Sequence, residues 1–300
     1  MIRQVTHNRQ EATHLAEPIS ESTTAPAWAL DQTANDKQNA LPSAAEQRPV
    51  VSVVIPALNE AENLPHVLPR VPGWVHEVLL VDGHSTDDTI AVAQALYPAI
   101  RVLAQEGEGK GAALRTGFAA ASGDIIVMLD ADGSTDPAEI PAFIGALLAG
   151  ADFAKGSRFL QGGGTDDMPL YRKLGNWCFV LGVRFLFGGH YTDLCYGYNA
   201  FWRQVLPHLD LDADGFEIET MMNVRALHAH LKVAEVPSFE AARVYGSGRL
   251  RTIPDGWRVV KTIFHEWVNP RVRRVDGRGA PHRKSALLTS QLWDGSGSDD

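Results

Sequence analysis

Two aspartates one residue apart, Asp130 and Asp132, are the residues whose type and spacing point most directly to chemistry in this chain. They follow residues 125–129 (IIVML), an apolar run that predicts a strand buried on both faces. Open α/β sheets bind their ligands at the carboxyl ends of such strands. Two carboxylates that project in one direction can ligate a hard divalent cation, which can also hold a diphosphate. An acidic turn is the alternative explanation for so short a motif.

The segments around this strand alternate between two patterns. Apolar runs predict further strands, and helical patterns lie between them. This alternation predicts a three-layer α/β fold with a mostly parallel central sheet, whose ligand edge carries Glu60, Asp82, Asp130 and Asp132. The strands are expected over 51–55, 75–82, 100–104, 125–129, 152–158, within 191–201 and over 232–238, and the helices over 60–70, 90–96, 112–121, 137–149, 170–187, 215–230 and 254–267.

A glycine-rich loop at 106–111 (EGEGKG) invites comparison with a phosphate-binding P-loop. The Walker spacing is missing, and so is the Ser or Thr that should follow the lysine. We therefore expect a flexible connection, whose backbone amides and Lys110 can still approach a phosphate at the start of the next helix.

The C-terminal half combines carboxylates with basic segments. Glu217 and Glu219 lie at the start of a predicted helix, where they are either chemically usable or only a favourable N-terminal charge. The predicted helix over 170–187 mixes basic residues with aromatic and aliphatic ones. It either lies on a membrane surface or is a core helix with a solvated basic stripe. The glycine-rich segment 161–167 is expected to be a mobile loop.

Composition limits the possible classes of protein. The chain has 300 residues, of which 45% are hydrophobic, which suffices for one sizeable core. Its net charge of -9 at pH 7 argues against a general affinity for nucleic acid. Cys178 and Cys195 make neither a disulfide framework nor a metal spacing, which favours a reducing compartment. We expect a cytoplasmic protein without a transmembrane segment.

The ends of the chain differ from its centre. Residues 1–48 show no sustained periodicity and are expected to form a disordered N-terminal tail. Residues 49–268 hold the predicted folded domain, and 269–300 are expected to form a flexible C-terminal tail. That tail contains a basic group, Arg271, Arg273 and Arg274.

Several motifs resemble, in the same order, those of the inverting family 2 glycosyltransferases with the GT-A fold. Within that family they look most like the dolichyl-phosphate or polyprenyl-phosphate mannosyl- and glucosyltransferases. The resemblance runs from Val51 to Trp267, so 49–268 is expected to be a GT-A glycosyltransferase domain. The matching segments are 56–60 (PALNE), 81–87 (VDGHSTD), 130–132 (DAD), 156–159 (GSRF), positions 172 and 176, and 243–250 (RVYGSGRL).

The resemblance implies a role for each matching residue. Pro56, Asn59 and Glu60 belong to the opening motif by the nucleotide, and Asp82 contacts the base. Asp130 and Asp132 hold Mg²⁺ or Mn²⁺. The acceptor phosphate is positioned by Arg158, Arg172, Asn176, Arg243 and Arg249. The departures from the family pattern are Gly83 where many members have a second Asp, Ser134 where some have a longer side chain that reaches the metal, Asn176 for Ser, Gly248 for Ser and Arg249 for Lys.

The resemblance implies that a hexose moves from a nucleoside diphosphate sugar, of the GDP-mannose or UDP-glucose type, to a polyprenyl or dolichyl phosphate. Asp132, assisted by Asp130, would hold the cation that stabilises the departing diphosphate. A phosphate monoester, whose second pKa is about 6, is already a nucleophile at neutral pH and needs no base. A hydroxyl acceptor would need one, for which the candidates are Glu217, Glu219 and Asp193.

Three other functions stay open. The acceptor can be soluble, either a phosphorylated small molecule or a glycan hydroxyl, or the chain can bind a nucleotide-sugar without catalysis. The third function is that of a nucleotidyltransferase. A Gly- and Arg-rich signature at the end of the first strand would be expected for it, and this chain has PALNE there instead. With a lipid acceptor, we expect the protein to lie peripherally at the inner membrane face, through the helix over 170–187 and the basic group at 271–274.

Overall fold

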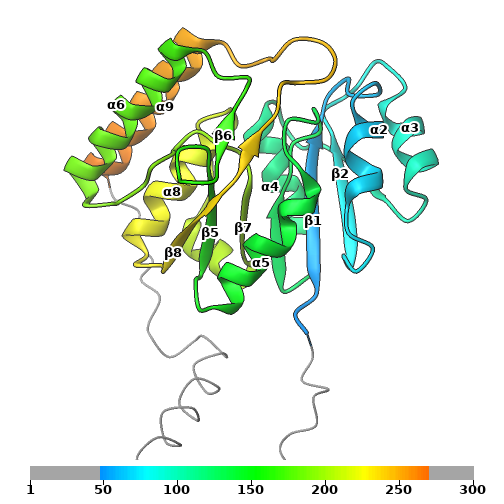
Figure 1. The fold of residues 1–300 in the computed structure, drawn as a ribbon, viewed down its shortest axis with the longest axis horizontal. Helices are drawn as coiled ribbons and strands as arrows, with labels where there is room; N and C mark the ends of the chain where they lie inside the picture. Colours follow the sequence, from blue (N-terminus) through cyan, green and yellow to red (C-terminus); the bar gives the residue numbers. More distant parts are fainter. Residues whose placement is uncertain (1–47, 270–300) are drawn as a thin grey trace, which may run out of the picture. The chain divides into compact units, whose positions relative to one another are not determined.

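The computed structural model describes residues 48–269, so the predicted tails and the basic group at 271–274 lie outside the described residues. Figure 1 shows a twisted sheet with helices on both of its faces. The strand order is β3-β2-β1-β4-β7-β5-β8, and β7 is antiparallel to both of its neighbours. The expected mostly parallel sheet is thus confirmed. The strands are β1 (Val51–Ala57), β2 (Glu77–Asp82), β3 (Arg101–Ala104), β4 (Ile125–Met128), β5 (Phe153–Ser157), β7 (Asn199–Trp202) and β8 (Val233–Pro237).

The helices agree with the sequence pattern except over 203–209, where the pattern predicts no helix and the structure has η3 and α7. The pattern predicts a helix interrupted by prolines over 60–70, and the structure has two short helices within this range. Pro65 and Pro69 each lie in the first turn of one of them, the position that a helix tolerates for proline. The helices are α2 (Leu64–Val67), η1 (Leu68–Arg70), α3 (Thr89–Leu96), α4 (Lys110–Ala120), η2 (Pro137–Glu139), α5 (Ile140–Leu148), α6 (Leu170–Phe187), η3 (Arg203–Val205), α7 (Leu206–Leu209), α8 (Ile218–His228) and α9 (Thr252–Val268).

Part of the segment expected to be a mobile loop is paired with another segment. Residues Gly164–Thr165 form β6, which runs parallel to β9 (Phe239–Glu240). The Thr165 hydroxyl also donates a hydrogen bond to the Glu240 carboxylate, at 2.6 Å. This ribbon brings Glu240 close to the end of β5.

Helix α4 packs directly on β1 and β2, and this packing fixes the position of its first residue relative to the sheet. A Cβ at Gly117 would lie 2.3 Å from Cγ1 of Val54, so only glycine permits this approach. The first residue of α4, Lys110, is thereby held at the carboxyl edge of the sheet.

Glu77, at the start of β2, provides a pH-dependent part of the stability. Burial alone would raise the pKa of its carboxyl group, but hydrogen bonds from Ser52, Ser122 and Arg101 outweigh burial and lower that pKa from 4.5 to about 2. A lowered carboxyl pKa stabilises the fold above the unfolded pKa, and the stabilisation disappears as pH falls through the folded pKa. We expect wild type to exceed Glu77→Gln by about 3 kcal/mol in unfolding free energy at pH 7. Urea unfolding between pH 7 and 2.5 should show this gap narrowing below about pH 4.5; a constant gap would contradict the assignment.

Candidate active site

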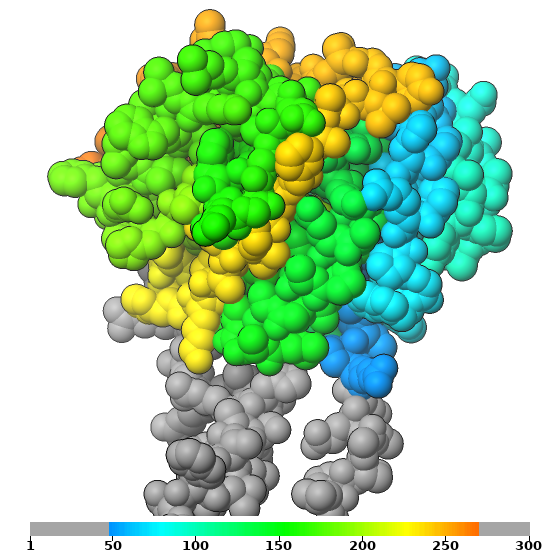
Figure 2. All heavy atoms as spheres, in the orientation of Figure 1, coloured from blue at the N-terminus to red at the C-terminus, as the bar shows by residue number. Residues whose placement is uncertain are grey.

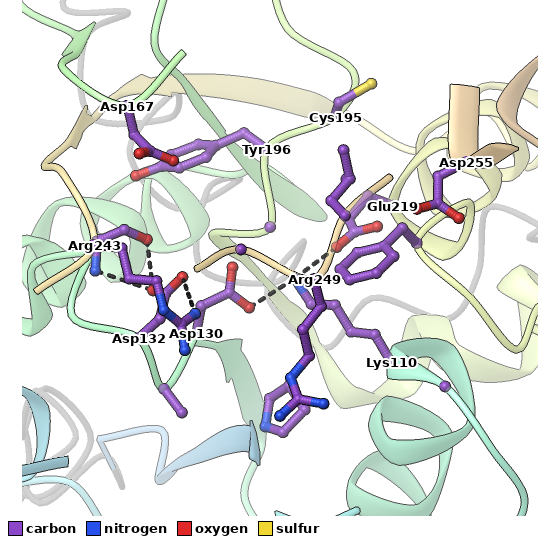
Figure 3. A pocket seen from close by; sticks show the side chains of 18 of the residues that line it. Lys110, Asp130, Asp132, Asp167, Cys195, Tyr196, Glu219, Arg243, Arg249 and Asp255 are labelled. Atoms are coloured by element: carbon purple, nitrogen blue, oxygen red, sulfur yellow. Dashed lines mark hydrogen bonds and ion pairs between the residues drawn. The ribbon is translucent and has the colours of Figure 1, made fainter. Parts of the chain in front are cut away.

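A cavity of about 710 Å³ lies at the carboxyl edge of the sheet, within the range of small-molecule sites. Figure 3 shows charged side chains from several elements converging in it. The predicted site residues that line it are Pro56, Glu60, Lys110, Asp130, Asp132, Arg158, Arg172, Asn176, Glu219, Arg243 and Arg249. The structure does not place Asn59, Asp82, Asp193 or Glu217 in its lining.

Asp132 is oriented by the turn that follows it. Its Oδ1 accepts hydrogen bonds from the Ser134 backbone N–H (3.0 Å) and hydroxyl (2.7 Å), while its Oδ2 lies 3.3 Å from Nη1 of Arg243. Ser134 therefore positions Asp132. The second oxygen of Asp132 faces the basic loop rather than the protein interior.

Asp130 belongs to a chain of three charges. Nζ of Lys110 lies 2.6 Å from Oδ1 of Asp130 and 2.9 Å from Oε1 of Glu219, as the dashed lines of Figure 3 show. Burial alone lowers the pKa of an ammonium group, but the two carboxylates outweigh it and raise the pKa of Lys110. Burial raises the pKa of Glu219, which Lys110 opposes. Lys110 is thus a protonated cation beside the predicted metal pair.

The glycines of the 106–111 loop make this position of Lys110 possible. Gly109 has a φ of 91°, and a Cβ on it would lie 2.4 Å from the Asp214 carbonyl oxygen. The N–H of Gly111 donates to that same oxygen at 2.7 Å. The loop is therefore held against the segment before α8, which carries Glu219.

Arg243 joins the opening motif to the aspartate pair. Its Nη2 lies 2.7 and 2.5 Å from the two carboxylate oxygens of Glu60, and its Nη1 faces Asp132. Nearby, Tyr245 and Asn63 exchange hydrogen bonds, and Arg249 donates to the Leu58 carbonyl at 2.8 Å. Figure 2 shows the segment after β9 lying against the N-terminal part of the domain. We call residues 241–251 the strap.

Arg158 is held by carboxylates on two sides. Its Nε and Nη2 donate to Asp193 at 2.7 and 2.9 Å, and its Nη1 donates to both oxygens of Glu240 at 3.0 Å. Burial opposes both charges, yet the pairing raises the pKa of Arg158 and holds that of Asp193 below its usual range. The ring of Tyr196 lies 4.8 Å from this guanidinium. Glu240 and Tyr196 were not singled out in the sequence, where neither belongs to a recognisable chemical motif.

Arg172 and Asn176 lie on α6, one turn apart, but their side chains have different partners. Arg172 donates to the Leu250 carbonyl at 3.1 Å and so contacts the strap. Oδ1 of Asn176 accepts from the Leu194 N–H at 3.0 Å, and its Nδ2 contacts the Thr192 carbonyl at 3.5 Å. Both ends of the Asn176 side-chain amide therefore contact the backbone of residues 192–194 and help to position that loop.

The remaining predicted residues support the cavity from outside. Oδ1 of Asn59 accepts from the Thr86 N–H at 2.7 Å, and Oδ2 of Asp82 accepts from the Ser85 N–H at 3.1 Å. Oε1 of Glu217 accepts from the Gly215 N–H at 3.1 Å. The other oxygens of Asp82 and Glu217 are buried and have no hydrogen-bond partner within residues 48–269.

The aspartate pair fits a divalent cation that arrives with its substrate. Among the described residues, no group of three or more His, Cys, Asp or Glu side chains is arranged to hold a metal by itself. Asp130 and Asp132 supply hard oxygen donors only. Mg²⁺ commonly uses one or two carboxylates, and takes its other ligands from water and substrate phosphates. The donor set is thus suited to a cation bound together with a diphosphate.

Comparison with known proteins agrees with this geometry. Residues 52–209 match the family model described as glycosyl transferase family 2. A dolichol-phosphate mannosyltransferase of Pyrococcus furiosus is 34% identical over 71% of this chain and 60% of its own length. A polyprenol monophosphomannose synthase of Mycolicibacterium smegmatis is 34% identical over 75% of this chain and 89% of its own length. The chain belongs to glycosyl transferase family 2 and is a glycosyltransferase.

A solved structure shares the fold. Glucosyl-3-phosphoglycerate synthase of Mycobacterium tuberculosis, in complex with Mn²⁺, uridine diphosphate and phosphoglyceric acid, superposes with a TM-score of 0.59. It is 26% identical and covers 76% of this chain and 81% of its own. The same synthase has also been solved with Mg²⁺ and uridine diphosphate.

Proposed function

We propose that this glycosyltransferase moves a hexose from a nucleoside diphosphate sugar, of the GDP-mannose or UDP-glucose type, to a polyprenyl phosphate at a membrane surface. The observation that carries the proposal is one cavity that holds an aspartate pair beside several arginines and is lined in part by α6 and α9, two helices that also carry exposed apolar side chains. The relatives named as acting on dolichol or polyprenol phosphates support the lipid acceptor. The folded domain is proposed to span 49–268.

The donor half of the cavity suits a diphosphate leaving group. Asp130 and Asp132 would hold Mg²⁺ or Mn²⁺, which supplies Lewis-acid stabilisation of the departing diphosphate. Lys110 adds a fixed positive charge beside the same position. Arg243 holds Glu60 and Asp132 together, so it keeps the donor edge organised.

The acceptor half favours a phosphate over a hydroxyl. Glu219 is paired with Lys110, Asp193 is paired with Arg158, and Glu217 lies outside the cavity lining. Each carboxylate predicted as a general base is therefore either paired with a cation or outside the cavity lining. A phosphate monoester needs no base, and Arg172 and Arg249 of the same cavity offer guanidinium groups to position it.

Helices α6 and α9 carry exposed apolar side chains through which the protein can contact lipid. The two helices lie side by side in Figure 1. Several large apolar side chains of α6 are exposed, while Val180 and Val183 on its other face are buried in a core cluster. The exposed face of 170–187 is therefore largely apolar, not a solvated basic stripe. The exposed apolar residues, here called the α6–α9 face, are Leu170, Leu174, Trp177, Leu181, Phe185, Ile253, Trp257, Val260, Phe264 and Trp267. Contiguous apolar surfaces of this kind mark interaction sites.

The charged residues of α6 and α9 indicate which kind of membrane surface the α6–α9 face fits. Helix α6 contains no acidic residue, and both acidic residues of α9, Asp255 and Glu266, are buried. The exposed charged residues include Arg184, Arg258 and Lys261, although the whole chain carries a net charge of -9. An apolar face with basic residues and interfacial tryptophans matches an anionic bilayer. Within the described residues, no helix is long and apolar enough to cross a membrane.

Vesicle binding tests the membrane part of the proposal. We expect the protein to cosediment with phosphatidylglycerol-containing vesicles. The double variant Trp257→Ser/Phe264→Ser should bind these vesicles at least about tenfold more weakly, because each lost ring removes about 1.5–3 kcal/mol of apolar burial. Trp74→Ser, an equally exposed tryptophan elsewhere, is the matched control and should bind as wild type does. Equal binding by both variants, or none by wild type, would contradict a membrane role for the α6–α9 face.

A soluble phosphorylated acceptor is the second candidate, because the synthase that shares this fold was solved with phosphoglyceric acid. The two acceptors are separated by offering a polyprenyl phosphate and 3-phosphoglycerate to the same enzyme with the same donor. Transfer to phosphoglycerate at equal or higher efficiency would favour the soluble acceptor.

A further inference from the structure

The five lysine and arginine side chains that line the cavity fall into two groups. Three of them are already paired with two carboxylates each. These groups are Lys110 with Asp130 and Glu219, Arg158 with Asp193 and Glu240, and Arg243 with Glu60 and Asp132. The other two, Arg172 and Arg249, have only neutral hydrogen-bond partners within residues 48–269. The unpaired positive charge of the described lining is therefore limited to these two guanidinium groups.

Glu240 is the carboxylate in excess at Arg158. The buried Asp193 pairs with Nε and Nη2 of Arg158 and balances its single charge. Both oxygens of Glu240 also accept from Nη1, at 3.0 Å, so the three side chains together carry a surplus negative charge. Burial lowers the pKa of nearby Lys155 and raises that of Glu235, so this pair of opposite groups adds no net charge. The side chain of Glu240 is 15% exposed and lines the cavity, so the surplus charge faces the ligand space.

Glu240 lies near the start of α6, the helix that carries Arg172. Its Oε2 accepts from Oγ1 of Thr165 at 2.6 Å, and that oxygen accepts in turn from the backbone N–H of Met168 at 3.1 Å. Met168 comes just before α6, and Arg172 lies in the first turn of the helix. All three of Glu240, Met168 and Arg172 line the cavity. A phosphate held by Arg172 therefore lies in the part of the cavity that Glu240 borders.

We infer that Glu240 is a specificity-determining residue, which restricts the acceptor to phosphate monoesters of neutral alcohols. Arg172 and Arg249 together balance one phosphate dianion. A second anionic group, such as a carboxylate close to the phosphate, would find no unpaired cation and would face the surplus charge of Glu240. Like charges brought together in this way disfavour a ligand. The inference rests on the proposed function, because it requires a phosphate acceptor in this cavity.

Two small phosphates that differ in one group test the inference by binding alone. The first, sn-glycerol 3-phosphate, has a hydroxymethyl group where 3-phosphoglycerate has a carboxylate. Each competes with farnesyl phosphate, a short polyprenyl phosphate, for the intact protein in the presence of GDP or UDP and Mg²⁺, and calorimetry gives the dissociation constants. We expect wild type to bind sn-glycerol 3-phosphate about tenfold more tightly than 3-phosphoglycerate, and Glu240→Gln to bring this ratio close to one.

The ratio separates acceptor selection from support of Arg158. If Glu240 served only to orient Arg158, its loss would weaken both small phosphates equally. Asp166→Asn is the matched control, because it removes an exposed carboxylate of the same ribbon that is outside the cavity lining, and it should keep the wild-type ratio.

Three results would overturn the inference and leave the proposed function standing, as long as farnesyl phosphate binds. They are a wild-type ratio of one or below, a ratio unchanged in Glu240→Gln, and failure of sn-glycerol 3-phosphate to compete. Failure of farnesyl phosphate to bind would instead overturn the lipid-phosphate acceptor of the proposed function itself.

Discussion

Asp132→Ala is expected to lower kcat/KM for sugar transfer by about a thousandfold or more, because it removes an anionic ligand where the leaving diphosphate must be stabilised. The same change should weaken the binding of nucleoside diphosphate more in the presence of Mg²⁺ or Mn²⁺ than in EDTA. Steady-state kinetics and calorimetry with and without metal measure the two effects.

The matched control is Asp88→Ala, which removes an exposed aspartate that makes no capping hydrogen bond at the start of α3. Its kinetics should equal those of wild type. If Asp132→Ala retained more than about a tenth of wild-type activity, or lost nucleotide affinity equally with and without metal, the role assigned to the aspartate pair would be wrong.

Lys110→Met is expected to lower kcat by about 10²–10³-fold, because a preorganised charge beside the diphosphate position is lost. The change also leaves Asp130 and the buried Glu219 without their shared cation. Breaking such a buried pair typically costs about 3 kcal/mol of unfolding free energy. Kinetics at saturating donor and urea unfolding of the same samples separate the two consequences.

Lys110→Arg keeps the positive charge and should recover part of both losses, although its planar guanidinium cannot reproduce the ammonium geometry. Lys232→Met removes an exposed lysine at the start of β8, at the other edge of the sheet, and should change neither quantity. A Lys110→Met enzyme with wild-type kcat would show that Lys110 is a structural cation without a part in transfer.

The main elements follow from local sequence patterns. Helix α6 occupies 170–187 as predicted, because Pro169 can precede a helix and Gly188 adopts a φ of 73° at its end. The apolar runs at 51–55 and 125–129 give central strands because both faces of the sheet are covered. These signals act over a few residues, so they are visible without the fold.

The pairing of charges was not predictable, because it joins segments far apart in the chain. Arg158 meets Asp193 and Glu240, and Arg243 meets Glu60 across 183 residues. The period of an amphipathic helix also does not say which face is buried. Helix α9 buries Glu266, which lies 2.6 Å from Arg225, and exposes its aromatic side chains. An amphipathic helix of a soluble protein normally buries its apolar face and exposes its charged one.

Formation of an organic-extractable sugar product is the decisive measurement for a lipid-phosphate acceptor. Wild-type protein is given labelled GDP-mannose or UDP-glucose, Mg²⁺ or Mn²⁺, and a polyprenyl phosphate in vesicles. We expect label to enter the lipid fraction as a polyprenyl phosphate hexose only when the lipid phosphate is present, and EDTA to abolish the reaction. Donor turnover that proceeds at the same rate without the lipid, with label only in water-soluble products, would contradict a lipid-phosphate acceptor.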